Sequence, residues 1–333
     1  MFFLFISARR SSFVHHFTGN RALVIFLRSK YGYLQLERRI TGSTGQLHLY
    51  PKDIGTVLVP ILEEGIQNQL TKAFRASLDL LKQSKSFYLQ AEQFVLKEIG
   101  WDKLRLSQPR YWSVRVSQAR EVHRVDAEHF QPKYDKLLEQ LKKTSKVKRI
   151  ADILDEPIQK GVTPDYEPNG SIVVVNSQHL GRYNLNYEAT DRTTEAFWKA
   201  NNRSQIRQND VMIYATGAYI GRTNTYVEKA RALAGVDVLL VRPTKEINPL
   251  YLSVFLNSSP GLMQSKKFSS GSGQAHIYPD GVRSYWIYAP PETFQQKIAD
   301  LVKESYTTRQ KAKALLEKAK EKVEAVILGN WQE

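Results

Sequence analysis

The sequence has no cysteine, no long apolar run and comparatively few acidic residues. The absence of cysteine excludes disulfides, cysteine-liganded zinc sites and a cysteine nucleophile. A membrane-spanning helix needs about 20 consecutive apolar residues. The apolar start of the chain ends at Ile6 and is followed by Arg9 and Arg10, the reverse of a secretory signal. We therefore expect a soluble, cytoplasmic protein that makes no membrane contact.

Motifs of common enzymes are absent as well. The chain has no Gly-Lys pair for a phosphate-binding loop and no Asp/Glu-x-Lys triplet for a metal-dependent nuclease. Its histidines lack the spacing of metal ligands. The segment Asn248-Pro249-Leu250-Tyr251 is close to the Asn-Pro-Pro-Tyr loop of adenine methyltransferases, but no Gly-rich cofactor loop precedes it, so we interpret it as a loop entering a helix. We expect no catalysis, no metal and no cofactor.

Positive charge is in surplus. The chain holds 48 Lys and Arg against 33 Asp and Glu, a net charge of +15. Residues 101–150 hold 13 basic and 6 acidic side chains, whereas residues 151–291 are nearly neutral with 14 and 13. A surplus of this size favours a polyanionic partner such as nucleic acid. The densest basic run, 142–149, is also explained by a solvated helix end.

A long-period internal repeat organises the chain. Phe26-Leu27 through Gly45-Gln46-Leu47-His48-Leu49-Tyr50-Pro51 recurs as Phe255-Leu256 through Gly273-Gln274-Ala275-His276-Ile277-Tyr278-Pro279, at a constant offset of 228 residues from Gly45 onward. Because glycine supplies turn conformations and the motif stands at both junctions, a turn before each helix is favoured over a DNA contact.

Each copy leads into a long segment with apolar or small residues at alternating steps of three and four. This spacing is typical of helices that pair as a coiled coil. A helix of about 35 residues would span roughly 50 Å. We expect helices over 62–100 and 292–333 that pack on each other. The side chains expected to pair are Leu70, Ala73, Leu80, Phe87, Ile298, Leu301, Ala312 and Leu315.

Residues 101–291 have the pattern of a separate mixed domain. A helix is expected near 127–143 and another near 249–256, with short strands at 171–175, 210–214, 226–227 and 236–241. Clusters of Gly, Asn, Pro and Ser separate the strands. The predicted fold class is therefore α+β, with one mixed domain flanked by two long helices.

The repeat layout resembles the specificity subunit of type I restriction–modification systems. The residues that carry the resemblance are Gly271 to Ile277, Pro290 to Ile298, their first copies at 42–46 and 67–70, Arg124 to Tyr134, and Gln208 to Met212. The resemblance covers about residues 22 to 328. It implies that the two long helices pair as an antiparallel coiled coil and separate the recognition domains. It implies a non-catalytic subunit that reads double-stranded DNA, while methyltransferase subunits and, indirectly, restriction subunits act on it.

The chain departs from the family pattern at its start. The family usually has two complete recognition domains, and here only the end of the first precedes the helix. The resemblance thus implies four parts: a remnant of a first recognition domain at 1–61 (with 1–21 unassigned), a helix at 62–100, a complete domain at 101–291 and a helix at 292–333. Such a chain would read one half of a bipartite target, or would dimerise to rebuild the pair.

Base reading needs cations for phosphates and bidentate side chains for base edges. The polar loops of 151–291 supply these residue types. The candidate DNA-binding residues are Lys160, Thr163, Asn176, Ser177, Gln178, His179, Arg182, Asn202, Arg203, Tyr219, Arg222, Lys266, Lys267 and Ser272. Three alternatives stay open: a coiled-coil adaptor that does not bind DNA, a truncated subunit without function, and a nuclease or methyltransferase with an unrecognised site.

Overall fold

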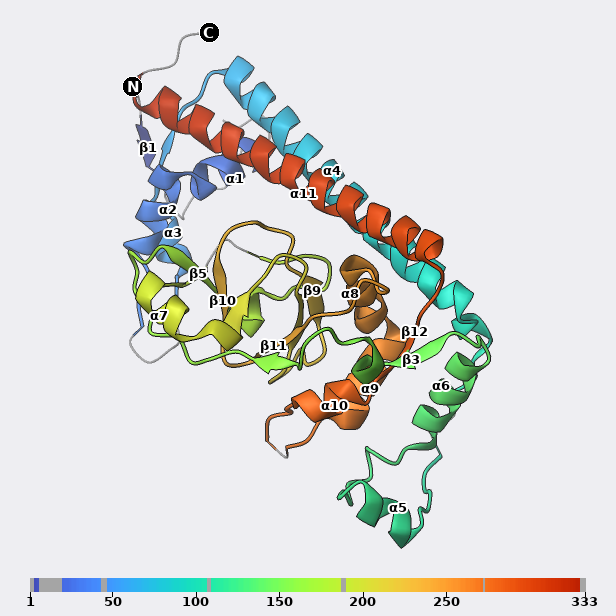
Figure 1. Cartoon of the computed structure of the whole chain (residues 1–333). Helices are drawn as coiled ribbons and strands as arrows, with labels where there is room; N and C mark the ends of the chain where they lie inside the picture. Colours follow the sequence, from blue (N-terminus) through green and yellow to red (C-terminus); the bar gives the residue numbers. More distant parts are fainter. Residues whose placement is uncertain are drawn as a thin grey trace. The chain divides into compact units, whose positions relative to one another are not determined.

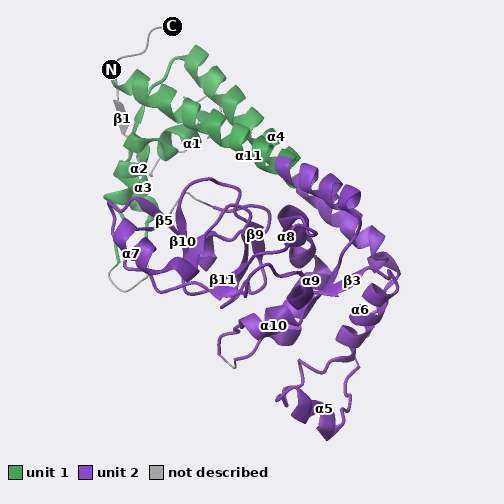
Figure 2. Cartoon of the chain, in the orientation of Figure 1, with its two compact units in different colours: residues 1–86, 304–333 green, residues 87–303 purple. Residues whose placement is uncertain are grey.

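The computed structural model describes residues 3–5, 20–42, 47–106, 109–186, 190–271 and 273–329 (Figure 1). The chain divides into two compact units, and both division points fall inside long helices (Figure 2). Unit 1 comprises residues 1–86 and 304–333, and unit 2 comprises residues 87–303. In the described part of the chain, no helix is long and apolar enough to cross a bilayer.

The two long helices are α4 (Glu64–Glu98) and α11 (Glu292–Ile327). Within unit 1, Ser77 Oγ donates to the carbonyl of Ala312 over 3.0 Å, and Ser84 Oγ lies 3.2 Å from Ser305 Oγ. The contacting residue number therefore rises along α4, from 77 to 84, while it falls along α11, from 312 to 305. The predicted antiparallel pair of helices is confirmed.

Small side chains bring the two backbones together. Ser77, Ser84 and Ser305 are buried, and the Ser305 hydroxyl also donates to the carbonyl of Ser84 over 2.7 Å. Of the residues expected to pair, three are buried and five are half-buried: Leu70, Ile298 and Ala312, then Ala73, Leu80, Phe87, Leu301 and Leu315. In unit 2, the neighbouring Tyr88 is more deeply buried than Phe87. Its hydroxyl accepts a hydrogen bond from Asn257 Nδ2 over 2.9 Å. The heptad pattern did not indicate this second packing face.

The remaining elements of unit 1 form a small α/β cap on the helix pair. They are β1 (Phe3–Phe5), α1 (Asn20–Arg28), α2 (Lys30–Glu37), α3 (Pro51–Ile54) and β2 (Leu58–Pro60). β1 and β2 pair antiparallel. The core of the cap contains Phe26, Val59 and Leu70 together with Ala319 and Val323 of α11. Residues 62–63 lie between β2 and α4, and Leu62 belongs to the same core.

Unit 2 contains two four-stranded sheets with the strand orders β6-β5-β10-β7 and β4-β11-β8-β9, and a separate β12-β3 pair. The strands are β3 (Val147–Arg149), β4 (Gln159–Lys160), β5 (Ile172–Val175), β6 (Arg192–Thr193), β7 (Gln205–Ile206), β8 (Val211–Tyr214), β9 (Thr223–Thr225), β10 (Ala232–Ala234), β11 (Val238–Val241) and β12 (Trp286–Tyr288). The helices are α5 (Val116–Glu121), α6 (Pro132–Lys142), α7 (Glu195–Ala200), α8 (Pro249–Asn257), α9 (Ser259–Phe268) and α10 (Pro279–Arg283), with short 3-10 turns η2 (Trp101–Lys103), η3 (Ile150–Ile153), η4 (Ser177–His179) and η5 (Asn202–Ser204). One apolar cluster, including Val175, Met212, Ala234 and Leu240, joins the two four-stranded sheets.

The α+β prediction is confirmed, with differences in the strands. Three of the four expected strands form, as β5, β8 and β11. The strand expected at 226–227 is wrong, because the ladder with β8 runs through Thr223–Thr225 instead. Asn248 accepts hydrogen bonds from the backbone of Leu250 and Tyr251 and caps α8, as expected of a loop entering a helix.

The sequence repeat is a structural repeat. In unit 1, Gln35 Nε2 donates to the carbonyl of Leu58 over 3.0 Å and Gln35 Oε1 accepts from its N–H over 2.8 Å. In unit 2, Gln264 makes the same two bonds to Trp286, at 2.8 and 2.6 Å. The order α1, α2, α3, β2, α4 thus recurs as α8, α9, α10, β12, α11, and β1 pairs with β2 as β3 pairs with β12.

In each copy, an isolated β-bridge joins the histidine of the repeated glycine motif to a residue that precedes the motif. The bridges are Thr41–His48 and Ser270–His276. Gly42 and Gly271 have φ of 131° and 109°, in the region that favours glycine. Gly45 and Gln46 lie outside the described residues.

Candidate nucleic-acid interface

A groove of about 760 Å³ on unit 2 brings together four segments from three separate parts of the sequence. They are the loop after η4, the β8–β9 turn, the helix pair α8–α9 and the repeated glycine loop. Its described lining contains three cations and no carboxylate. The lining residues are Arg182, Gly217, Ala218, Tyr219, Ile220, Arg222, Asn257, Leu262, Lys266, Ser269, Gly273, Gln274 and Ala275. Four of the predicted DNA-binding residues, Arg182, Tyr219, Arg222 and Lys266, therefore converge on this unit 2 groove.

Tyr219 and Arg222 lie on the β8–β9 turn. The Arg222 guanidinium carbon is 3.5 Å from the centroid of the Tyr219 ring, a cation–π stack. The turn depends on Gly221, which has φ of 86° and whose position leaves no room for a Cβ beside Ser265 Oγ. Tyr219 is 53% exposed. Arg222 is half-buried, and the stack restrains its guanidinium, which lowers the entropy that the side chain loses on binding a ligand.

Arg182 is held by a buried carboxylate. Its Nη2 lies 3.2 and 3.4 Å from the two carboxylate oxygens of Glu92 on α4, and Glu92 is 6% exposed. The Arg182 side chain is still about half exposed. One edge of its guanidinium is thus fixed to the helix, and the rest remains directed to solvent.

Lys266 belongs to a network built by the 124–134 motif. Its Nζ lies 3.7 Å from Glu128, which also accepts from Lys133 over 3.0 Å and from the Tyr134 hydroxyl. Burial disfavours the charged carboxylate of Glu128, but the hydrogen bonds from Tyr134 and Lys133 outweigh it and hold its pKa below the ordinary value. Glu128 is therefore an ionised anchor close to the groove.

The same motif fixes the end of α9. Arg124 Nη2 donates to the carbonyl of Ser269 over 2.6 Å, and its Nε bonds to Asp126 over 2.7 Å. His129 Nδ1 lies 3.0 Å from the carbonyl of Lys267. The sequence pattern singled out this motif without indicating its role, because the residues that it contacts lie about 140 positions away.

A second group of candidates lies outside this groove's lining. Ser204 Oγ of η5 donates to the carbonyl of Lys160 over 3.2 Å, which places Asn202 and Arg203 beside β4. Lys160, Thr163, Asn202 and Arg203 are all exposed. They form a separate polar surface on unit 2.

The strand-end candidates differ from the expectation that their side chains are displayed. Asn176 Nδ2 donates to Asp191 Oδ2 over 3.0 Å, and its N–H donates to His179 Nδ1 over 2.9 Å. His179 is 3% exposed, so its ring belongs to the turn. Ser177 is half-buried, and Gln178 remains exposed. Backbone groups at the end of a buried strand need partners, and the His179 ring supplies one to the N–H of Asn176.

Lys267 also differs from the expectation of a DNA contact. It is half-buried, with Nζ 5.5 Å from the centroid of the Tyr134 ring. Burial lowers the pKa of Lys267. Ser272 lies outside the described residues.

Comparison with known proteins identifies the family of the chain. The family model for the type I restriction modification DNA specificity domain matches residues 142–321, more than half of the chain. The chain belongs to this family. No curated protein matches it.

Solved structures similar to this specificity-domain protein are distant. One is a chain from a type I R-M system described for its complex assembly and conformational transition (15% identity, 90% of this chain and 70% of that chain, TM-score 0.36). Others are the HsdS subunit of Thermoanaerobacter tengcongensis (13%, 95% and 72%, TM-score 0.36) and a type I restriction-modification S subunit of M. genitalium (12%, 96% and 74%, TM-score 0.39). The family assignment rests on the family model.

Proposed function

We propose that this specificity-domain protein recognises double-stranded DNA through the unit 2 groove and has no catalytic activity of its own. The convergence of Arg182, Arg222 and Lys266 on one groove whose described lining contains no carboxylate is the observation that carries this proposal. Neutralising DNA phosphates requires clustered cations, and base edges require restrained bidentate donors. The stacked Arg222 fits the second requirement, since a guanidinium pairs with guanine O6 and N7.

The exposed group around Lys160 supplies a second set of contacts in this proposal. Lys160 and Arg203 would neutralise phosphates, while Thr163 and Asn202 would bond to sugar or base edges. Gln178 and Ser177 would contribute at the strand end. His179 and Lys267 would act by supporting neighbouring residues, because both are engaged inside the fold.

Methyltransferase subunits are the proposed protein partners, with restriction subunits joining through them. Membership in the type I restriction–modification specificity family supports this assignment. Each paired helix of about 35 residues is roughly 50 Å long, which corresponds to about 15 base pairs. The pair would set the distance to a second reading domain, so this chain would read one half of a bipartite target.

The test is selection from a randomised duplex library with the full chain. The proposal predicts that bound molecules converge on a short motif, and that the chain alone neither cleaves DNA with Mg²⁺ nor methylates it with S-adenosylmethionine. Co-purification with a methyltransferase subunit tests the partner assignment. If the bound duplexes share no motif and the chain does not bind duplex DNA at low salt, the coiled-coil adaptor or a chain without DNA function is favoured.

A further inference from the structure

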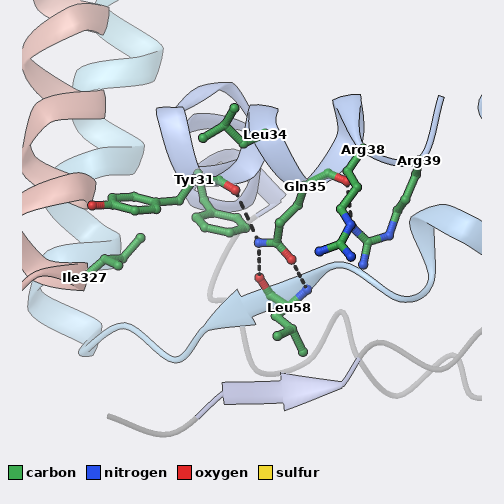
Figure 3. Close-up of a pocket in the computed structure, with 8 residues that line it drawn as sticks. Tyr31, Leu34, Gln35, Arg38, Arg39, Leu58 and Ile327 are labelled. Atoms are coloured by element: carbon green, nitrogen blue, oxygen red, sulfur yellow. Dashed lines mark hydrogen bonds between the residues drawn. The ribbon is translucent and has the colours of Figure 1, made fainter.

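Unit 1 carries a groove of about 910 Å³ beside α2 and β2. Figure 3 shows Tyr31, Leu34 and Gln35 of α2 on one side, Leu58 of β2 below them, and Ile327 at the end of α11. Leu34 is 48% exposed, although it sits in the middle of this lining. Of the elements that the structure describes, no helix covers the groove.

The structural repeat gives this unit 1 groove a counterpart in unit 2. Gln35, Arg38 and Arg39 occupy the repeat positions of Gln264, Lys267 and Phe268, and Leu58 occupies that of Trp286. The reciprocal glutamine bonds described above give both surfaces the same backbone framework.

The counterpart in unit 2 is covered by α6. Only a gap of about 50 Å³ remains there, between the four repeat-related residues and one face of α6. That face consists of Tyr134, Leu137, Leu138 and Leu141. Three of these side chains are almost fully buried. The same framework is therefore closed in unit 2 by an amphipathic helix and open along its described residues in unit 1.

The C-terminal end of a long helix contacts α6 in unit 2, and the C-terminal end of the other long helix lines the groove in unit 1. Gln140 Nε2 of α6 donates to the carbonyl of Ile99 over 2.8 Å, just after α4 ends, and Gly100 follows with φ of 65°. In unit 1, α11 ends at Ile327, which lines the groove, and Gly329 follows with φ of 73°. A helix seated in the unit 1 groove would find the carbonyls at the end of α11 in the equivalent place.

Charge also points to the occupant. The carboxylate of Asp135, in the first turn of α6, favours the charged form of Lys267. Arg38 stands in place of Lys267, and Arg39 adds a second cation to the unit 1 groove. A complementary helix would therefore carry an acidic residue in its first turn beside its apolar face.

We propose that the unit 1 groove binds an α6-type helix on a second polypeptide that is not a copy of this chain. Its binding face would present an aromatic residue, then leucines three, four and seven positions later, with an acidic residue in the first turn. A second copy of the chain does not supply this helix. Each copy has two frameworks, one in each unit, and one α6, which already covers the framework of its own unit 2. This proposal does not depend on DNA recognition.

The experiment uses the full chain and a fluorescent peptide of residues 127–146. A lactam bridge between Glu139 and Lys143, both exposed on α6, holds the peptide helical, so the cost of folding does not mask binding. Fluorescence anisotropy should show saturable one-to-one binding. A peptide with Leu137→Asp and Leu141→Asp should not bind, because each carboxylate would have to be buried.

Two neighbouring positions of α2 give matched variants. Leu34→Glu should weaken peptide binding at least about tenfold, because it places a charge in the apolar contact. Tyr33→Glu is the control, since Tyr33 is 57% exposed and does not line the groove. Unchanged circular dichroism in both variants would show that the fold persists.

Two results would overturn the proposal. One is absence of peptide binding, or binding that Leu34→Glu and Tyr33→Glu weaken equally. The other is a homodimer, measured by sedimentation without peptide, that Leu34→Glu alone dissociates, because a second copy would then be the occupant.

Discussion

The close packing of the two long helices depends on Ser305. Its hydroxyl donates to the carbonyl of Ser84 over 2.7 Å and lies 3.2 Å from the Ser84 hydroxyl, and both side chains are at most 1% exposed. Replacing Ser305 by leucine removes these bonds and inserts a larger side chain where the backbones approach. Loss of the hydrogen bonds costs about 1 kcal/mol, and overpacking adds about 1–3 kcal/mol.

We therefore expect Ser305→Leu to lower the free energy of unfolding by about 2–4 kcal/mol. Urea titration followed by far-ultraviolet circular dichroism measures this change. Glu304→Leu is the matched control, because residue 304 is exposed on the same helix turn and its variant should stay within about 0.5 kcal/mol of the wild type. Equal stability of the two leucine variants would refute the close packing of α4 and α11.

Three further predictions concern unit 2. Asp210→Ala should cost about 3 kcal/mol in urea titration, because Arg242, which is 8% exposed and bonded twice to Asp210, loses a partner; no change would contradict this. Because the folded-state pKa of Glu128 lies below 4.5, its stabilisation is present above that pH and is lost as pH falls through the folded value. Glu128→Gln should flatten the acid limb of stability against pH, whereas parallel curves would refute the assignment. Gly271→Ala should cost about 1–3 kcal/mol, because φ is 109° and an added Cβ would meet the carbonyl of Gln274; calorimetry measures it, and an unchanged melting temperature would count against it.

The repeat and the long helices were predictable because their signals are local and periodic. Spacings of three and four residues define a helix face, and a duplicated motif needs no tertiary information. The strand at 223–225 was missed because Thr-Asn-Thr has no alternation of apolar and polar residues, and all three side chains are buried by neighbouring elements.

The candidate site was predictable by residue type and not by arrangement. Arg182, Tyr219, Arg222 and Lys266 were identified as suitable donors, but nothing local shows that they meet in one groove. The burial of His179 depends on contacts made by the fold, as does the cover of Tyr134 over Lys267. The buried Glu92 partner of Arg182 lies 90 residues away on a helix whose sequence pattern indicates only pairing.

Two motifs that carry the family resemblance have structural roles within unit 2. The 124–134 motif holds the end of α9 through Arg124 and Glu128, and so places Lys266 and Ser269 at the groove. Asp210, in the motif around Gln208, pairs with Arg242 inside the domain. Neither motif lines the unit 2 groove.

The most direct test of DNA recognition by the unit 2 groove is the salt dependence of duplex binding by Arg222→Ala. Anisotropy titrations at several salt concentrations compare it with the wild type and with Arg283→Ala, a charge-matched variant at an exposed position of α10 outside the groove lining. We expect Arg222→Ala to bind about 5- to 150-fold more weakly to a selected duplex, or to lower the slope of log affinity against log salt by about 0.9 if Arg222 contacts a phosphate. Arg283→Ala should match the wild type. Equal affinities and equal slopes for all three proteins would contradict the account.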